Sequence, residues 1–248
     1  MKILSWDVGI YNLAYCLIDF NTNDKKSTII DWNIINLRSE DEKVAQKNKS
    51  LLCNDACKNK ASVLHNSTNE HYCLKHAKKL YRYECKKKVI SDITFDQLFK
   101  KIKKKKKKKK KMKIQELGIS LLIQLEKQKE LFINVDCVLI ENQPVLKNPT
   151  MKSIQMILYT YFLMNGIIKK TMKELKFISA RNKLKMYDGP PIELKTKNKY
   201  VRRKKLSIAH CKYMIQDNEK WTIFLNEHKK KDDLADSYLQ AKWFCRDL

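Results

Sequence analysis

Acidic residues stand at three separated places in this sequence where carboxylates can bind a metal ion. They follow two apolar, strand-like runs and open the last helical segment: Asp7, Glu141, and Asp232, Asp233 and Asp236. On a helix, residues three apart such as Asp233 and Asp236 project from one face. Carboxylates brought together repel one another unless divalent cations neutralise them, and oxygen ligands favour Mg²⁺ or Mn²⁺ over Zn²⁺. Two such ions about 4 Å apart activate water for attack on a phosphodiester, which is the chemistry that this pattern predicts.

Each acidic residue also has a structural interpretation. An aspartate after a strand is commonly a turn residue, and acidic residues in the first turn of a helix commonly cap it. The dipole at a helix N-terminus stabilises their charge without any metal. Convergence of all these carboxylates would favour the metal site, and the choice between Asp232 and Asp233 stays open from the sequence alone.

The strands that would carry these residues are visible in the hydrophobic pattern. Three β-like runs come first: Lys2–Val8, Leu13–Phe20 and Thr28–Leu37. Turn-forming residues 9–12 separate the first two runs, which predicts an antiparallel meander. Two further strand-like runs follow later in the chain, at Val135–Ile140 and Leu175–Ser179.

Segments with helical periodicity alternate with the later strands. Apolar residues recur at helical spacing from Ile114 to Leu125, and a second helix is expected from about Thr150 to Phe162. After a basic loop at 181–198, Lys199–Ile215 and Asp232–Phe244 are expected to form two more helices. This alternation predicts an α/β fold.

The character of the chain changes between about Arg38 and Lys113. Hydrophobic periodicity fades there, Asn, Lys and Cys predominate, and the stretch ends in nine consecutive lysines, Lys103–Lys111. We therefore expect one domain formed by residues 1–37 and 114–248, interrupted by an insertion over residues 38–113. The lysine tract is either a phosphate-binding segment, whose binding would depend strongly on salt, or a low-complexity linker.

Cysteine and histidine residues in this insertion have the spacing of a zinc site. Cys53 and Cys57 form a C-x₃-C pair, and Cys73 and His76 form a C-x₂-H pair after fifteen intervening residues. Three thiolates and one imidazole suit tetrahedral Zn²⁺, whose binding would stabilise a segment this polar. The alternative ligands are Cys85, His65 and His71. The structural alternative is that the cysteines are reduced thiols in a loop without regular structure.

Composition narrows the class of partner. Lysine and arginine outnumber aspartate and glutamate by 53 to 27, giving a net charge of +26, which attracts a polyanion. No run approaches the roughly 20 apolar residues of a membrane-spanning helix, so we expect nucleic acid and not a membrane as the partner. Asp7 interrupts the apolar N-terminus, which is therefore not expected to be a signal peptide. We expect an intracellular protein with reduced thiols.

Three short motifs resemble those of one nuclease family, in the family's order. Ser5–Ala14, SWDVGIYNLA, resembles the first-strand motif of RuvC-like Holliday junction resolvases of the poxvirus type, which belong to the RNase H-like superfamily. Ile140–Pro144, IENQP, is similar to the second motif, and Lys231–Ser237, KDDLADS, to the closing helix with two aspartates three apart. The resemblance spans nearly the whole chain except the insertion, which departs from the compact bacterial form.

The resemblance implies both a fold and a site. The fold is RNase H-like, a five-stranded mixed sheet with three antiparallel strands, flanked by helices. The metal-binding catalytic residues carried over by position are Asp7, Glu141, Asp233 and Asp236, with Asp232 as the alternative to Asp233. The catalytic lysines taken from their placement are Lys183 and Lys205, with Lys204 as the alternative to Lys205. Such a lysine would position the scissile phosphate or stabilise its developing charge.

The activity implied by the resemblance is Mg²⁺-dependent resolution of Holliday junctions. Metal-activated water would cut two strands of a branched DNA symmetrically and leave 5′-phosphates and 3′-hydroxyls. Two symmetric nicks require two active sites, so a homodimer is expected. The alternatives are an RNase H-like nuclease of other specificity and a non-enzymatic, zinc-containing protein that binds DNA or is associated with transcription.

Composition and motifs together also suggest a source. Lysine, asparagine and isoleucine are abundant, whereas glycine and proline are scarce at 4 residues each. With the poxvirus-type motifs, this indicates a large DNA virus, in which the protein would resolve genome concatemers in a cytoplasmic replication compartment. A mitochondrial relative is the alternative, although Asp7 and Asp19 make the N-terminus a poor transit peptide.

Overall fold

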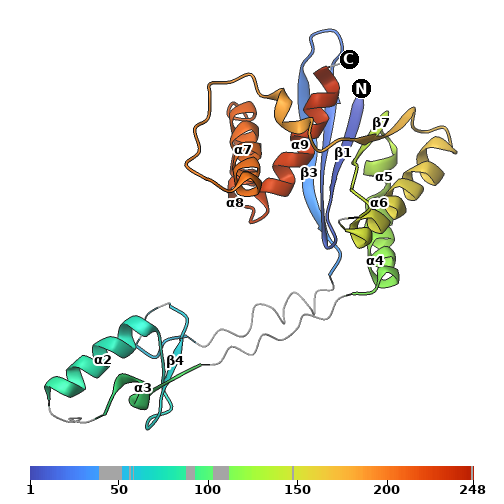
Figure 1. The fold of residues 1–248 in the computed structure, drawn as a ribbon. Coiled ribbons are helices and arrows are strands. Elements are labelled where there is room, and N and C mark those ends of the chain that lie inside the picture. Colours follow the sequence, from blue (N-terminus) through green and yellow to red (C-terminus); the bar gives the residue numbers. More distant parts are fainter. Residues whose placement is uncertain are drawn as a thin grey trace. The chain divides into compact units, whose positions relative to one another are not determined.

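The computed structural model describes residues 1–38, 52–55, 57, 59–87, 93–102, 112–146, 148–246 and 248. The chain forms two units: one joins Met1–Arg38 to Met112–Leu248, and the other is Ser39–Lys111 (Figure 1). The second unit falls within the segment that the sequence predicts as an insertion. The lysine tract Lys103–Lys111 lies outside the described residues.

The first unit is built on a five-stranded sheet in the order β3-β2-β1-β7-β8. Its strands are β1 (Lys2–Val8), β2 (Asn12–Phe20), β3 (Ser27–Asn36), β7 (Cys137–Glu141) and β8 (Glu174–Ile178). The first three strands are antiparallel neighbours, whereas β7 pairs in parallel with both β1 and β8. These features confirm the predicted α/β fold with a mixed sheet and three antiparallel strands.

Both faces of the sheet are covered, which explains why its central strands are so apolar. In β1, Leu4, Trp6 and Val8 contact one core, whereas Ile3 contacts the other. All residues of β7 are buried. Because side chains alternate between the two faces along a strand, the odd-numbered residues of β1 and β7 share one face.

One face packs against helices from the middle of the chain. These are α4 (Ile114–Lys127), α5 (Lys129–Ile133) and α6 (Pro149–Phe162), which continues into a π-helical turn, η1 (Leu163–Ile167). Trp6, Tyr15 and Phe132 form an aromatic cluster in this core, with ring centroids 4.9 to 5.2 Å apart. The Asn148 side chain caps α6 by accepting a hydrogen bond from the Met151 backbone N–H at 3.3 Å.

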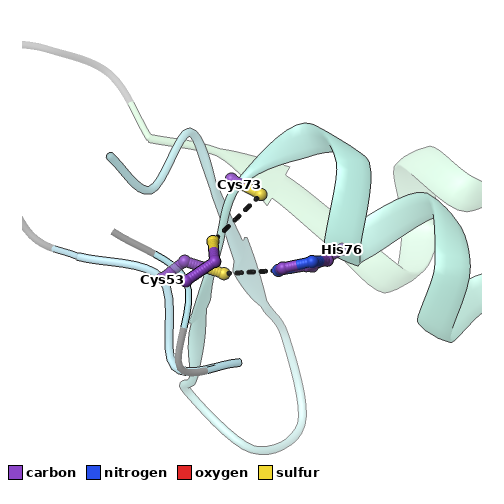
Figure 2. Close-up of side chains that lie close together, drawn as sticks. Cys53, Cys73 and His76 are labelled. Atoms are coloured by element: carbon purple, nitrogen blue, oxygen red, sulfur yellow. Dashed lines mark hydrogen bonds between the residues drawn. The ribbon is translucent and has the colours of Figure 1, made fainter. Parts of the chain in front are cut away.

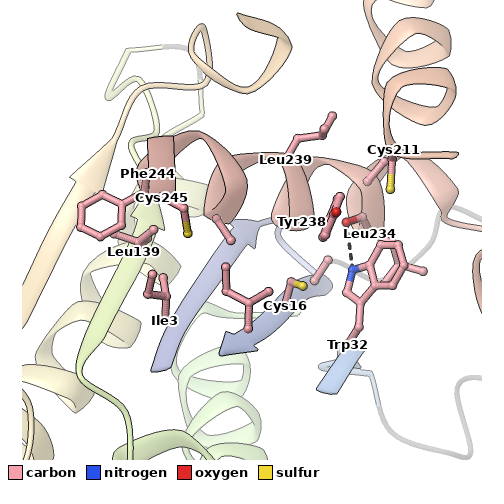
Figure 3. Packing of buried hydrophobic residues seen from close by; sticks show 14 of the residues in the cluster. Ile3, Cys16, Trp32, Leu139, Cys211, Leu234, Tyr238, Leu239, Phe244 and Cys245 are labelled. Atoms are coloured by element: carbon pink, nitrogen blue, oxygen red, sulfur yellow. Dashed lines mark hydrogen bonds between the residues drawn. The ribbon is translucent and has the colours of Figure 1, made fainter. Parts of the chain in front are cut away.

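The other face packs against helices from the end of the chain. These are α7 (Lys199–Met214), α8 (Glu219–Glu227) and α9 (Lys231–Arg246). Trp32 Nε1 of β3 donates to the carbonyl of Leu234 in α9 at 3.0 Å (Figure 3). Gln240 Nε2 of α9 donates to the carbonyl of Trp6 at 3.3 Å. These buried bonds fix α9 against β3 and against β1, the strand that carries Asp7.

The second unit has a small sheet in the order β5-β4-β6. Its elements are β4 (Val63–His65), β5 (His71–Tyr72), α2 (Leu74–Lys86), α3 (Phe95–Leu98) and β6 (Phe99–Lys101). Buried Val63, Ala77, Leu98 and Phe99 form its core. Strands of two or three residues are too short for hydrophobic alternation to reveal, so the sequence predicts none of them. In the described part of the chain, no helix is long and apolar enough to cross a membrane.

Candidate active site and metal centre

Asp7 and Glu141 stand at the ends of two adjacent parallel strands. The register between β1 and β7 pairs Trp6 with Ile140, and the next residue of each strand is the acidic one. Alternation puts both carboxylates on the face that α9 covers. The fold therefore brings together two acidic residues that are far apart in the sequence.

The turn that follows Asp7 requires a glycine. A Cβ atom at Gly9 would lie 2.4 Å from the carbonyl oxygen of Asn12, a distance at which the backbone would have to shift. Gly9 thus lets β1 and β2 turn tightly two residues after the acidic side chain. This explains on steric grounds why a glycine stands two residues after Asp7.

Helix α9 adds the remaining acidic residues. Leu234, Ala235 and Tyr238 are buried in the core against the sheet, which fixes the rotation of the helix about its axis. Asp233 and Asp236 then line the same cavity as Asp7 and Glu141. All the carboxylates expected to bind the catalytic metal therefore border one space.

Lys183 reaches these carboxylates from η2 (Lys183–Met186), a 3₁₀ turn after β8. Its Nζ lies 3.4 Å from Oε1 of Glu141 and forms an ion pair with Asp236. Burial alone would lower the pKa of Lys183, but the charges of the carboxylates around it, Asp7 first among them, raise the pKa above its ordinary value. Lys183 is therefore a stable cation among the acidic residues.

Asp7 and Asp236, in contrast, are harder to ionise than an ordinary carboxyl group. Burial, followed by the charge of Glu141, raises the pKa of Asp7 well above its ordinary value. Burial also raises the pKa of Asp236, although Lys183 and a hydrogen bond from Ser207 favour its charged form. Acids that resist ionisation in this way lack sufficient positive charge nearby. A divalent cation among their oxygens would supply it.

Helix α7 turns Lys204, and not Lys205, toward this site. Lys204 lines the cavity and pairs with Asp232. Lys205 is not among the lining residues, and its Nζ donates to Oγ1 of Thr196 at 3.3 Å. Consecutive side chains on a helix differ in direction by about 100°. Of the two lysines that the sequence offers, the structure therefore brings Lys204, and not Lys205, to the cavity, and which of them acts in catalysis stays a prediction.

Lys204 also distinguishes the two adjacent acids of α9. Burial would raise the pKa of Asp232, but the hydrogen bond and charge of Lys204 lower it below the ordinary value. Burial and the charge of Asp232 raise the pKa of Asp233, which pairs with Lys230 at 3.4 Å. Asp232 is held by a close cation, which favours Asp233 as the residue available to a metal.

Ser207 belongs to the site although the sequence does not single it out. Its side chain is buried, and its hydroxyl donates to Oδ1 of Asp236 while Lys183 donates to Oδ2. Both oxygens of Asp236 are therefore oriented by protein groups. The only sequence signal for Ser207 is its spacing of three residues from Lys204 on the same helix.

These side chains border an open cavity of about 850 Å³ within the first unit. Besides the carboxylates, basic residues line it: Arg181, Lys183, Arg203, Lys204 and Lys230. Two tyrosines, Tyr11 and Tyr200, also line it. A cavity lined by both carboxylates and basic side chains can bind cations at the carboxylates and an anionic ester at the basic groups.

In sequence, the chain is similar to an uncharacterized protein of Acanthamoeba polyphaga mimivirus. The two are 28% identical over an alignment of 320 positions, which covers 98% of this chain and 74% of the viral protein. No protein-family model matches the chain.

In fold, the chain is similar to solved Holliday junction resolvases. The yeast mitochondrial resolvase Ydc2 has a TM-score of 0.49 at 16% identity, over 98% of this chain and 78% of the yeast chain. The fowlpox virus resolvase, solved with Holliday junction DNA, has a TM-score of 0.46 at 16% identity, over 100% and 98% of the two chains. RuvC of T. thermophilus has a TM-score of 0.43 at 8% identity, over 100% and 96%. At these identities the similarity concerns the fold alone.

The fold is RNase H-like. The order of the strands, with three antiparallel and two parallel to the first, establishes this within the chain itself. In this unit Asp7 and Glu141 stand at the ends of the adjacent strands β1 and β7, and Asp233 and Asp236 stand on helix α9.

The second unit gathers the residues predicted to bind zinc. One candidate ligand atom from each of Cys53, Cys57, Cys73 and His76 lies within 4.8 Å of all the others. Sγ of Cys53 is 3.4 Å from Nδ1 of His76 (Figure 2). Sγ of Cys57 is 3.8 Å from Sγ of Cys73. Thiolates and imidazole at these separations can surround a single tetrahedral ion.

Local structure favours the thiolate form of Cys73, one of these ligands. Cys73 precedes α2, and the backbone N–H of His76, in the first turn of that helix, lowers the pKa of the Cys73 thiol, which favours the thiolate that a metal binds. The alternative ligands, Cys85, His65 and His71, are outside this group in the described part of the chain. The structure therefore provides a candidate metal site with the ligand set predicted from spacing.

Proposed function

We propose that the RNase H-like unit is a metal-dependent endonuclease that resolves four-way DNA junctions. The observation that carries the proposal is the convergence of the catalytic carboxylates with Lys183 on one cavity. Hydrolysis of a phosphodiester needs an activated water molecule and stabilisation of the charge that develops at phosphorus. Carboxylate-bound cations and a fixed lysine meet both needs.

The donor set fits Mg²⁺ or Mn²⁺. Its candidate atoms are all carboxylate oxygens, which hard cations prefer, and the raised pKa of Asp7 reflects burial beside another carboxylate. The residues that would hold the ions are Asp7, Glu141, Asp233 and Asp236. When bound, the ions would supply Lewis acidity that activates water and stabilises the leaving oxygen.

The protein's own groups orient this site. Lys183 restrains Glu141 and Asp236 and presents a positive charge to a phosphate in the cavity. The Ser207 hydroxyl restrains the second oxygen of Asp236. In this mechanism the attack occurs in line at phosphorus and leaves a 5′-phosphate and a 3′-hydroxyl, with no covalent intermediate.

The proposed substrate is DNA because the chain is strongly basic and cations border the cavity. The net charge is +26, and Arg181, Arg203 and Lys230 lie beside the carboxylates, where they would contact phosphates flanking the scissile one. Selectivity for junctions is inferred from the three RuvC-like motifs. Paired nicks in turn imply two active sites related by a twofold axis, and hence a homodimer.

The second unit is proposed to bind one structural Zn²⁺ through Cys53, Cys57, Cys73 and His76. Its hydrophobic core is small, so metal coordination would contribute much of the free energy that keeps it folded. The lysine tract Lys103–Lys111 remains a candidate for binding phosphates.

The biological setting that we infer is the replication of a large DNA virus. The mimivirus relative supports such a source. There the enzyme would resolve branched intermediates and concatemers during recombination and repair of the viral genome, in a cytoplasmic replication compartment.

A panel of substrates tests the proposal. The wild-type protein is incubated with Mg²⁺ or Mn²⁺ and a labelled four-way junction, a linear duplex of the same sequence, or an RNA–DNA hybrid. We expect paired, symmetric nicks in the junction and little cutting of the duplex. Cleavage of the hybrid alone would indicate an RNase H-type nuclease, and binding without cleavage would favour a DNA-binding protein. Either result would overturn the proposal.

A further inference from the structure

Helix α7 presents a row of side chains that leads out of the carboxylate cluster. Ser207, Lys204, Arg203 and Tyr200 are spaced at three, four and seven residues, which puts them on one helix face. All line the cavity. The row runs from Ser207, which is 2% exposed, to Tyr200, which is 66% exposed. It therefore forms a path from the acidic centre to solvent.

The inner half of this row, Ser207 and Lys204, and its outer half, Arg203 and Tyr200, differ in what they contact. Ser207 donates to Asp236 and Lys204 pairs with Asp232, so the inner half is engaged with the acidic residues. The guanidinium of Arg203 has no ion pair with any residue that the structure describes. Among the described residues, the Arg203 guanidinium is therefore available to bind an anionic ligand, whereas the exposed Tyr200 ring also contacts Lys204.

The Tyr200 side chain is exposed, but its backbone is held in position by a hydrogen bond. Its backbone N–H donates to Oδ1 of Asn198 at 2.9 Å, and that of Val201 donates to the same oxygen at 3.3 Å. This N-cap anchors the first turn of α7. Lys204 Nζ lies 5.0 Å from the centre of the Tyr200 ring. A tyrosine has only two side-chain torsions to restrain, so a ligand stacked on it incurs little entropic cost.

We propose that Tyr200 and Arg203 form a nucleotide subsite for the strand that is cut. The Tyr200 ring would stack on a base close to the scissile phosphate, and the Arg203 guanidinium would bind a neighbouring phosphate. This inference rests on the proposed nuclease function and adds a source of selectivity. In a continuous duplex the faces of the bases are covered by their neighbours, whereas a branch point interrupts stacking and exposes a base face. The subsite therefore favours branched over linear DNA.

Fluorescence of a base analogue tests stacking without any cleavage. Junctions carry 2-aminopurine at each branch-point position in turn, and binding is measured without added Mg²⁺. We expect one position to be quenched by the wild type and by Tyr200→Phe, which keeps the ring, but not by Tyr200→Leu. Affinity of Tyr200→Leu for the junction should fall roughly tenfold or more, the range for loss of one stacked base. The control is Tyr213→Leu, a tyrosine of α7 that does not line the cavity.

An abasic substitution identifies the stacked base independently. At the quenched position, removal of the base should weaken wild-type binding to the level of Tyr200→Leu and should not weaken Tyr200→Leu further. Unchanged quenching and affinity in Tyr200→Leu would overturn the subsite, as would an equal loss of affinity for linear duplex. If the wild type cuts the junction while Tyr200→Leu behaves like wild type, only the subsite is wrong. If the wild type cuts no DNA, the nuclease proposal fails.

Discussion

Nζ of Lys183 lies 3.4 Å from Oε1 of Glu141. The lysine comes from a 3₁₀ turn and the glutamate from the end of a central strand, and both are largely buried. The carboxylates raise the pKa of Lys183 against the effect of burial, so the lysine is charged at every pH at which the protein would act. It neutralises part of the acidic cluster and leaves the remainder for metal ions.

Replacing Lys183 with Gln should destabilise the protein when no divalent metal is present. The change leaves Glu141 and Asp236 without their buried cation, and breaking a buried ion pair in this way costs about 3–5 kcal/mol. Urea unfolding with and without Mg²⁺ measures the effect, and added Mg²⁺ should recover part of the loss. Lys183→Arg, which keeps the charge, is the matched control. A Lys183→Gln variant as stable as the wild type would show that this pair does not hold the site together.

Lys204 and Lys205 offer a comparison between neighbours. Lys204→Ala removes a cation from the cavity and leaves Asp232 unpaired beside Asp233, so we expect a loss of kcat/KM on junction DNA of roughly tenfold, equivalent to one charged hydrogen bond. Lys205→Ala removes only a contact with Thr196 and should stay within about twofold. Steady-state kinetics on both variants decide the point. A larger loss in Lys205→Ala would reverse the assignment.

The hydrophobic pattern predicts the strands and helices of the RNase H-like unit well because their apolar residues recur at regular spacing. Lys2–Val8 is observed as β1 with the predicted bounds, and burial of both sheet faces explains its apolar run. Helix α8 is missing from the prediction because it is short and only Trp221 and Leu225 are buried. The insertion itself is predicted, but its strands β4, β5 and β6 are not, because strands of two or three residues are too short to show hydrophobic alternation.

Within the site, the sequence predicts which residue types take part but not the direction in which a helical side chain points. The buried residues of α7 are Ser207, His210 and Cys211, which hydrophobic periodicity does not single out. The sequence therefore does not predict how α7 is rotated about its axis, and Lys204 cannot be distinguished from Lys205. Ser207 was overlooked for the same reason. Asp7 and Glu141 were easier to identify because a strand end fixes a residue's position more simply than a helix face does.

Zinc binding by the second unit should depend on Cys73 and not on Cys85. The full-length protein should carry one Zn²⁺ by metal analysis, and Cys73→Ser should lose it because a ligand is removed from a tetrahedral set. Cys85→Ser is the control, since Cys85 is exposed and outside the group. Retention of zinc by Cys73→Ser, or its loss from Cys85→Ser, would contradict the ligand assignment.

Asp136 should make stability depend on pH at the acidic end. The backbone N–H of Lys2 at 2.9 Å, followed by the Lys173 ammonium at 3.0 Å, lowers the pKa of Asp136. Because the folded pKa lies below the unfolded value of about 3.9, the stabilisation is present above that value and is lost as the pH falls through the folded pKa. Asp136→Asn should therefore cost about 1–2 kcal/mol at pH 7 and progressively less below about pH 4. Urea unfolding of the wild type and Asp136→Asn at pH 7 and below about pH 4 measures this. A difference in unfolding free energy that does not change with pH would contradict the role of the charge.

Cleavage of a synthetic four-way junction by the wild type, Asp7→Asn and Asp136→Asn in Mg²⁺ is the most direct measurement of the proposed chemistry. Asp136 immediately precedes β7 and is outside the cavity, so Asp136→Asn controls for the loss of a charge elsewhere. We predict paired symmetric nicks with 5′-phosphate ends for the wild type and Asp136→Asn, and none for Asp7→Asn, which should still bind the junction. Undiminished cleavage by Asp7→Asn, or no cleavage by the wild type with either Mg²⁺ or Mn²⁺, would contradict the assignment of these carboxylates as the catalytic centre.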